Sequence, residues 1–246
     1  MDHYVPVKSN GISVVFVHGG SFTGGDPENQ KPMANGLNKL GYNVFVIKYR
    51  LYLKGKSFGC ETATPEKLKA IRYAVEDIDD ATSFLTKHYA SLKIDTSKLI
   101  LSGSSAGAEA VLNYVYDPFV QRRSFRKHSY KAVMSFAGAV LDMNKLNAGT
   151  WIPVFLMHGT NDQLVPYGTA PHRFCKAADD GWLMMFGAET IYRKGVELNR
   201  PVTLYAYEGA GHEISNYMFR KFTEMDEFMK EVINGSSISQ QIIQTK

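Results

Sequence analysis

Residues 99–107 read Leu-Ile-Leu-Ser-Gly-Ser-Ser-Ala-Gly, a run of apolar residues that leads directly into the pattern G-x-S-x-G. A helical run follows, from Ser105 to Tyr116. Strand, sharp turn and helix in this order predict that Ser105 lies on a strained turn with its hydroxyl exposed, because glycines on both sides let the backbones approach closely. The start of the helix favours negative charge that develops nearby. We therefore predict that Ser105 is a nucleophile, against the simpler interpretation of a Gly-rich helix entry.

A second glycine-containing turn precedes this one in the chain. Residues 15–22 read Val-Phe-Val-His-Gly-Gly-Ser-Phe, so that an apolar strand ends in H-G-G. Acyl transfer creates a negative oxygen that needs backbone N–H donors already in place, and small residues let the backbone come close to it. We expect these donors at Gly20 and Ser21, with a further one at Ala106, the residue after the nucleophile. An ordinary turn after a strand is the alternative.

The rest of the chain alternates short β-rich runs with helical periodicity, which predicts an α/β fold with a mostly parallel central sheet and helices on both faces. Strands are expected at residues 12–17, 43–48, 98–102, 132–136, 153–157 and 202–207. Helices are expected at residues 31–40, from 64 to about 85, 105–116 and 214–233. Thr64 is expected to cap the second of these helices, with Pro65 at its first position.

A length of 246 residues fits one α/β domain over residues 1–246, with residues 235–246 as a frayed polar tail. The connections are expected to be short except at residues 49–64 and 117–130, which leaves no room for a cap domain. Hydrophobic residues make up 44% and charged residues 21% of the chain, as in soluble globular proteins.

Composition also argues against several classes of function. The net charge is only +4 and the basic residues are scattered, which does not favour nucleic-acid binding. No apolar run reaches the roughly 20 residues that span a bilayer. Cys60 and Cys175 form no CxxC pair and no histidine cluster accompanies them, so no metal site is expected. They are either buried thiols or one disulfide. The first residues lack the pattern of a signal peptide, and the compartment stays open between the cytoplasm and export after removal of a leader.

Four segments, in this order, carry a family resemblance: H-G-G-S-F at 18–22, G-S-S-A-G at 103–107, H-G-T-N-D-Q-L-V-P at 158–166 and G-A-G-H-E at 209–213. With them the chain resembles the α/β-hydrolase carboxylesterases, in the style of the HGGG-type esterases and lipases and of bacterial carbohydrate and feruloyl esterases. Ser21 stands where many relatives have a third glycine. Too few residues precede Ile12 for the family's first strands in full, so this edge is expected to be short or truncated.

The resemblance implies a base and an acid that follow the nucleophile in the chain. His212 comes directly after the last predicted strand, where the family carries its base, whereas His172 is expected in a helix and His158 in a structural role. Asp162, in the turn after the strand 153–157, is the expected acid because a carboxylate there holds the imidazole in the correct tautomer. Asp142, after the strand 132–136, is the rival.

The implied activity is hydrolysis of small acyl esters, of acetyl or feruloyl type, with a small molecule or an oligosaccharide as the alcohol and without metal or organic cofactor. Phe22, Tyr49, Tyr52 and Phe58 are expected either to line an aromatic rim around the site or to bury their faces in ordinary loops. Val165 is expected to wall the acyl side.

Two other classes of function stay open on the sequence. One is a serine peptidase of the prolyl-oligopeptidase type, whose catalytic domain shares the order of the triad. The other is an α/β-hydrolase that binds a ligand or partner without catalysis. The sequence specifies neither the natural acyl group and alcohol nor the oligomeric state.

Overall fold

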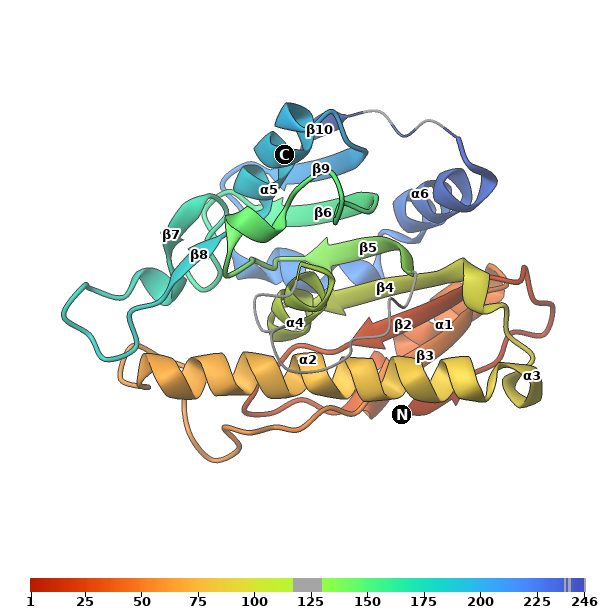
Figure 1. Ribbon diagram of the computed structural model, residues 1–246, viewed down its shortest axis with the longest axis horizontal. Helices are drawn as coiled ribbons and strands as arrows, with labels where there is room; N and C mark the ends of the chain where they lie inside the picture. The colour runs from red at the N-terminus through yellow and green to blue at the C-terminus, as the bar shows by residue number, and fades with distance from the viewer. Residues whose placement is uncertain (117–129, 237, 239, 246) are drawn as a thin grey trace.

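A computed structural model describes residues 1–116, 130–236, 238 and 240–245 of the chain. Its centre is an eight-stranded sheet in the order β1-β3-β2-β4-β5-β6-β9-β10 (Figure 1). β1 pairs antiparallel with β3, and the other neighbours are parallel. The strands are β1 (Asp2–Tyr4), β2 (Ser13–Val17), β3 (Asn43–Ile47), β4 (Leu99–Ser104), β5 (Tyr130–Phe136), β6 (Val154–Gly159), β9 (Val202–Tyr207) and β10 (Gln241–Thr245). The prediction of a mostly parallel α/β sheet is confirmed.

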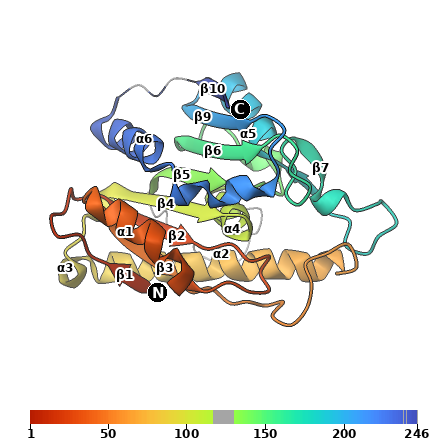
Figure 2. The ribbon, with the colours of Figure 1, turned by 180° about the vertical axis from the view of Figure 1, so that it is seen from behind.

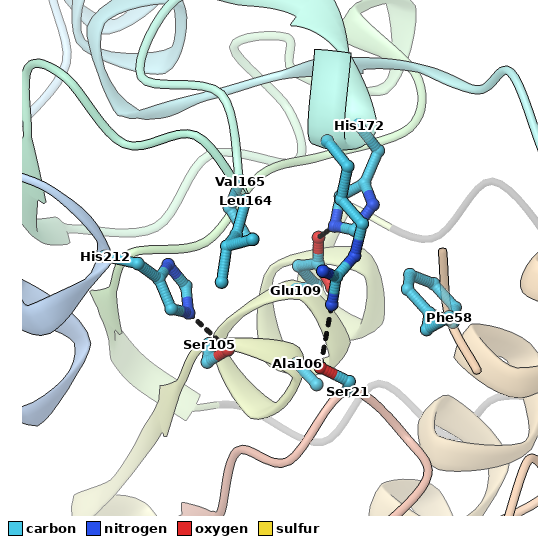
Figure 3. Close-up of a pocket in the computed structure, with 10 residues that line it drawn as sticks. Ser21, Phe58, Ser105, Ala106, Glu109, Leu164, Val165, His172 and His212 are labelled. Atoms are coloured by element: carbon cyan, nitrogen blue, oxygen red, sulfur yellow. Dashed lines mark hydrogen bonds and ion pairs between the residues drawn. The ribbon is translucent and has the colours of Figure 1, made fainter. Parts of the chain in front are cut away.

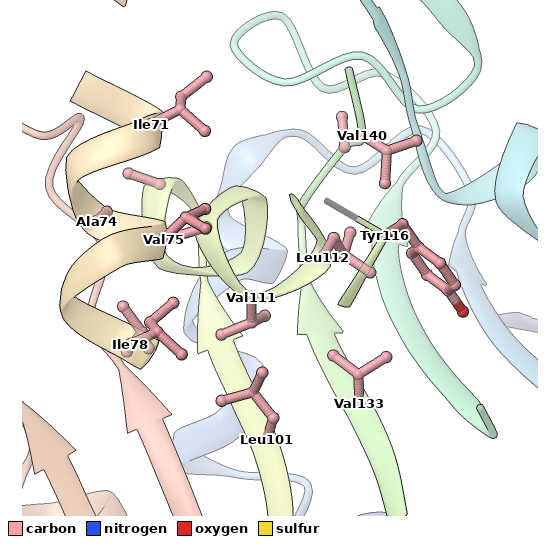
Figure 4. Close-up of a cluster of buried hydrophobic side chains, with 14 of the residues drawn as sticks. Ile71, Ala74, Val75, Ile78, Leu101, Val111, Leu112, Tyr116, Val133 and Val140 are labelled. Atoms are coloured by element: carbon pink, nitrogen blue, oxygen red, sulfur yellow. The ribbon is translucent and has the colours of Figure 1, made fainter. Parts of the chain in front are cut away.

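Helices cover both faces of this sheet, and side chains that alternate along the strands separate two cores. On β2, Val15 and Val17 belong to the core under α2 (Thr64–Lys87), α4 (Ala106–Val115) and α5 (Ala188–Glu197). Figure 4 shows α2 side chains of this core above Leu101 of β4. Val14 and Phe16 face the opposite core, under α1 (Lys31–Lys39) and α6 (Phe222–Asn234) (Figure 2). Two buried faces explain why these strands read as continuous apolar runs.

The strand order creates one place where the connections diverge. From β2 the chain passes to β3 on one side, and from β4 it passes to β5 on the other. Between such strands, a crevice opens outside their carboxyl ends, where ligands bind in open α/β sheets. The pair Val17 and Gly103 shows that the H-G-G turn and the G-x-S-x-G turn leave the sheet at the same level.

The shorter elements refine the expected pattern. They are η1 (Pro27–Gln30), α3 (Tyr89–Leu92), η2 (Thr96–Lys98), η3 (Met143–Lys145), β7 (Thr169–Pro171), η4 (His172–Phe174), β8 (Met184–Phe186) and η5 (His212–Phe219). The connection between β6 and β9 holds β7, β8 and α5, so the expectation that it is short is wrong. Of the connection predicted at 117–130, only Tyr130 lies within the described residues, as the first residue of β5.

Local predictions fail at two helices. Thr64 does not cap α2 but lies inside it, and its hydroxyl donates to the carbonyl of Trp182 at 2.6 Å. The helix predicted at 214–233 divides into the 3-10 helix η5 and the α-helix α6, because the backbone of Lys221 leaves helical dihedrals at φ −97° and ψ 45°. The local sequence preference therefore decides neither where α2 begins nor where the predicted helix 214–233 is interrupted.

Residues 241–245 form a strand, whereas the sequence suggested a frayed tail over residues 235–246. Gln241–Thr245 pairs in parallel register with β9, from Gln241 opposite Thr203 to Thr245 opposite Tyr207. Without this strand, β9 would present unpaired N–H and C=O groups at the edge of the sheet. The β-branched residues Ile242 and Ile243 suit the extended backbone.

The two cysteines are joined in a disulfide, which decides the alternative that the sequence left open. Cys60, in the loop between β3 and α2, lies with its Cα 5.3 Å from that of Cys175, directly after η4. The bond therefore ties two connections that both run at the carboxyl edge of the sheet. No described helix is long and apolar enough to cross a membrane.

Close packing between α4 and β2 predicts that Gly107 tolerates no side chain. A Cβ at this position would lie 2.0 Å from the carbonyl oxygen of Val17. We expect Gly107→Ala to lower the free energy of unfolding by about 3 kcal/mol or more, since backbone must move to relieve the clash. Gly24→Ala is the control, because nothing lies within 4 Å of a Cβ there. Urea denaturation of both variants checks this, and equal stability would contradict the packing.

The disulfide predicts a second effect on stability. It closes a loop with a sequence separation of 115 residues. We expect a reductant to lower the free energy of unfolding of the wild type by about 2–5 kcal/mol, because the unfolded chain gains freedom. The double variant Cys60→Ala, Cys175→Ala should resemble the reduced wild type and respond to no reductant. If the reductant leaves the melting temperature of the wild type unchanged, this result would argue against the disulfide.

Candidate functional site

Ser105 lies at the tip of the turn between β4 and α4. Its backbone has φ 51° and ψ −123°, a strained region for a residue with a side chain, and its N–H donates to the carbonyl of Phe136 at 2.8 Å. Strain of this kind gathers at functional sites, where the surrounding structure holds it in place. The predicted exposed turn is therefore present, with the hydroxyl held above the first turn of α4.

A chain of hydrogen bonds leads from this serine to a buried carboxylate. Ser105 Oγ lies 2.7 Å from Nε2 of His212, the first residue of η5 (Figure 3). His212 Nδ1 lies 2.7 Å from Oδ2 of Asp162, in the turn after β6. With Nδ1 donating to the carboxylate, Nε2 is free to accept the serine proton. The structure thus brings together the three residues that the sequence singled out.

Asp162 is fully buried and completely paired. Its Oδ1 accepts the backbone N–H groups of Leu164 at 2.8 Å and Val165 at 3.0 Å. Its Oδ2 lies 3.2 Å from Nε2 of His158, in addition to His212. Burial by itself raises the pKa of this carboxyl, but the hydrogen bonds from His158 and His212 outweigh it and hold the pKa below its usual range. His158 is therefore a buried partner of the acid.

The turn after β2 faces the same serine. Gly20 has φ +119°, and a Cβ there would lie 2.3 Å from the carbonyl oxygen of Gly24, so only glycine fits. Ser21 follows with φ 53° and lines the pocket together with Ala106. As the first residue of α4, Ala106 has a backbone N–H without an acceptor inside the helix. Tyr49, which the sequence suggested for the rim, supports this turn from below, with its hydroxyl donating to the carbonyl of His18 at 3.1 Å.

The pocket above Ser105 has a volume of about 220 Å³, including open space at its mouth. Its lining consists of Ser21, Phe58, Ser105, Ala106, Glu109, Leu164, Val165, His172, Arg173 and His212. Of the residues suggested for contact with substrate, Val165 and Phe58 line this pocket. The other predicted rim residues are elsewhere: Phe22 is buried against the ring of Phe58, and Tyr52 donates to Glu66. For Phe22 and Tyr49 the structure thus shows the alternative of burial that the sequence left open, because a loop sequence does not reveal which side is buried.

Three polar pocket residues were missed or placed differently by the sequence. Glu109 follows Ser105 by four residues, so one turn of helix puts it on the same face, a signal that the sequence does contain. His172, expected to pack in a helix, begins the short η4 and lines the pocket. Arg173 has no local signal, because only the tertiary fold brings η4 over the turn after β2.

The remaining candidates have other partners. Asp142, the rival acid, caps η3, with Oδ1 accepting the N–H of Asn144 at 2.9 Å. Glu213, beside the base, accepts the N–H of Gly211 at 2.9 Å. Neither hydrogen bond involves His212.

Comparison with solved structures finds the same fold in esterases. Esterase 2 from the Planctomycetes species Thermogutta terrifontis, with propionate bound, has a TM-score of 0.68 at 19% identity, over 94% of this chain and 88% of that one. The same esterase phosphoramylated by tabun has a TM-score of 0.68 at 20% identity, with the same coverage. Esterase PE8 has a TM-score of 0.65 at 21% identity, over 94% of this chain and 97% of that one. At these identities the likeness concerns the fold.

The sequence comparisons add a family. A family model described as BD-FAE matches residues 1–151, which is more than half of the chain. Among curated proteins, none matches this chain in sequence.

The low pKa of Asp162 predicts how stability depends on pH. Because its folded pKa lies below the unfolded value of about 3.9, the carboxylate stabilises the fold above that pH and loses this contribution as the pH falls toward the folded value. We expect the stability difference between wild type and Asp162→Asn to be largest near pH 5 and to shrink toward pH 2.5. Urea denaturation across this range measures it, and a constant difference would show that Asp162 is not held ionised.

Proposed function

Because this chain belongs to the BD-FAE family of α/β-hydrolase esterases, we propose that it hydrolyses small carboxylic esters, of acetyl or feruloyl type, including those on sugars, through an acyl-enzyme at Ser105. One observation carries this proposal: the unbroken hydrogen-bond chain from Ser105 Oγ through His212 to the buried Asp162. Such a chain activates a serine that is otherwise a weak nucleophile.

In the acylation step, His212 Nε2 takes the proton of Ser105 as Oγ attacks the ester carbonyl. The charge on the carbonyl oxygen is stabilised by backbone N–H groups at Gly20, Ser21 and Ala106, the last aided by the N-terminus of α4. Asp162, whose pKa is held low, stabilises the imidazolium without taking its proton. The bond from the carbonyl carbon to the alcohol oxygen then breaks, and His212 gives its proton to that oxygen.

In the deacylation step, His212 takes a proton from water, which attacks the acyl-enzyme carbonyl. The bond to Ser105 Oγ breaks, the proton returns to the serine, and the carboxylic acid leaves. The side chain of His212 is 20% exposed, so water reaches this position.

The size of the pocket supports a short acyl group. The space between its lining residues is about 220 Å³ even with the open solvent at its mouth included, which suits a short acyl group better than a long chain. Structures of Thermogutta terrifontis esterase 2 with propionate and with butyrate bound point the same way. A bulky alcohol, such as a sugar, would lie on the side of His212, which protonates the leaving oxygen.

The proposal predicts loss of activity in Ser105→Ala. We expect hydrolysis of 4-nitrophenyl acetate and butyrate by the wild type, and a decrease in kcat of roughly 10⁴-fold or more in the variant, because no acyl-enzyme forms. Absorbance of the released nitrophenolate measures both. Ser104→Ala is the control, since Ser104 is the buried neighbour in β4 and has no role in the mechanism.

Equal activity in wild type and Ser105→Ala would refute the mechanism. Labelling of the wild type, but not of the variant, by a fluorophosphonate would separate an activated serine from a protein that only binds ligands. Turnover of a peptide amide faster than of the matched ester would favour a peptidase instead.

A further inference from the structure

Arg173 lines the pocket beside Ser105 without a carboxylate partner. Its Nη2 donates to Ser21 Oγ at 3.2 Å, and within the described residues no Asp or Glu oxygen lies at salt-bridge distance from the guanidinium. Its Nε is buried and has no hydrogen-bond partner among the described residues. The side chain is half-buried, and its guanidinium keeps its charge at any physiological pH, so it can bind a further acceptor in the pocket.

Glu109, which also lines the pocket, faces His172, but its Oε1 has no hydrogen-bond partner within the described residues. Glu109 Oε1 lies 3.1 Å from His172 Nε2, and both side chains are buried (Figure 3). A second cation adds positive charge beside the pocket: Lys67, buried under Phe58, donates to the carbonyl of Gly181 at 2.7 Å. Burial lowers the pKa of Lys67 and the charge of Arg173 lowers it further, while the charges of Glu109, Glu61 and Asp179 raise it. Arg173 in η4 and Lys67 in α2 thus place positive charge beside the pocket, and within the described residues Arg173 forms no salt bridge, although its charge contributes to lowering the pKa of Glu61.

The part of the pocket that η4 lines lies on the acyl side of the proposed reaction. His212 must protonate the leaving oxygen, so the alcohol lies near His212, while the carbonyl oxygen points to the backbone of Ser21 and Ala106. The acyl chain takes the remaining direction, away from His212. Figure 3 shows Phe58 and His172 across Ser105 from His212. Arg173 follows His172 in η4 and reaches Ser21, so an acyl chain of a few carbons extends toward its guanidinium.

The position of Arg173 is fixed by the fold. Its backbone has φ 56°, and its N–H donates to the carbonyl of Leu164 at 3.0 Å. Cys175, two residues later, is tied by its disulfide to Cys60. A binding group on a segment held in this way loses little freedom when the ligand arrives.

We propose that Arg173 binds a carboxylate at the far end of the acyl group, so that half-esters of short dicarboxylic acids are preferred over neutral esters of the same length. The planar guanidinium matches a carboxylate with two parallel hydrogen bonds. This inference rests on the proposed esterase function, which it refines by naming the acyl group.

The test compares two esters that differ only in charge. Ethyl hydrogen succinate carries a terminal carboxylate, and ethyl succinamate carries an amide of the same size. We expect kcat/KM of the wild type to be roughly 10–100-fold higher for the succinate, as a hydrogen bond to a charged group provides. In Arg173→Gln the ratio should fall to about one, and in Arg173→Lys it should recover in part. Release of ethanol measures each rate, and circular dichroism confirms that the variants are folded.

The ratio of kcat/KM for ethyl hydrogen succinate to that for ethyl succinamate distinguishes recognition of charge from positioning of the turn at Ser21. If Arg173 only positions that turn, Arg173→Gln lowers both rates equally and the ratio of the variant stays at the wild-type value, which would overturn the proposal. A wild-type ratio of one or less would overturn it without any variant.

A second pair of esters tests the side on which the carboxylate binds. Acetoxyacetate and acetoxyacetamide carry the charge or its neutral match on the alcohol. A preference for acetoxyacetate that disappears in Arg173→Gln, with none for the succinate, would overturn the assignment to the acyl side. Failure of the proposed function is distinguishable, because it would abolish turnover of ethyl succinamate and 4-nitrophenyl acetate together with labelling of Ser105.

Discussion

The close approach of α4 to the end of β2 is the constraint on which the rest of the site depends. Gly107 has no room for a Cβ because the carbonyl oxygens of Val17 and His18 lie against it. Gly103 is equally restricted, since a Cβ there would lie 2.4 Å from the carbonyl oxygen of Gly107. Two glycines in the elbow therefore bring the backbone of the H-G-G turn next to Ser105. Side chains at either position would separate the proposed nucleophile from the donors proposed to stabilise the oxyanion.

Electrostatics then distinguishes the two ends of the proposed triad. Asp162 lies in the interior, where two backbone N–H groups and two imidazoles satisfy its oxygens and keep it charged. His212 lies at the boundary with solvent, and Ser105 faces the pocket. The negative charge of Asp162 is thus shielded from water, whereas His212, which must exchange protons, stays accessible to solvent. His158 contributes a second contact to the same carboxylate oxygen and also lies 3.1 Å from the carbonyl oxygen of Val165, a residue of the pocket wall.

The far wall of the pocket differs in character from the wall near His212. Leu164 and Val165 are apolar, and they follow the turn that holds Asp162. Glu109, His172 and Arg173 are polar, and two of them come from the short η4, which the disulfide anchors. One wall is thus built by the same turn that supplies the proposed acid. The other depends on the later part of the long connection between β6 and β9, whose first residues form the turn with Asp162.

The sequence by itself determined the elements whose signal is local. Apolar runs specified the buried strands, glycines with a serine between them specified the elbow, and the order of Ser105, Asp162 and His212 agrees with the contacts found in the structure. The geometry of the elbow follows from steric rules that act within a few residues. The sequence could not identify β10, because a polar tail becomes a strand only when the edge of β9 is available to pair with it. It also left open whether Phe22 and Tyr52 line a rim, because an aromatic residue in a loop has the same sequence signal whether it packs in the loop or lines a pocket. The pairing of Cys60 with Cys175, and the place of Arg173 over Ser21, were decided only by the tertiary structure, since segments more than one hundred residues apart come together there.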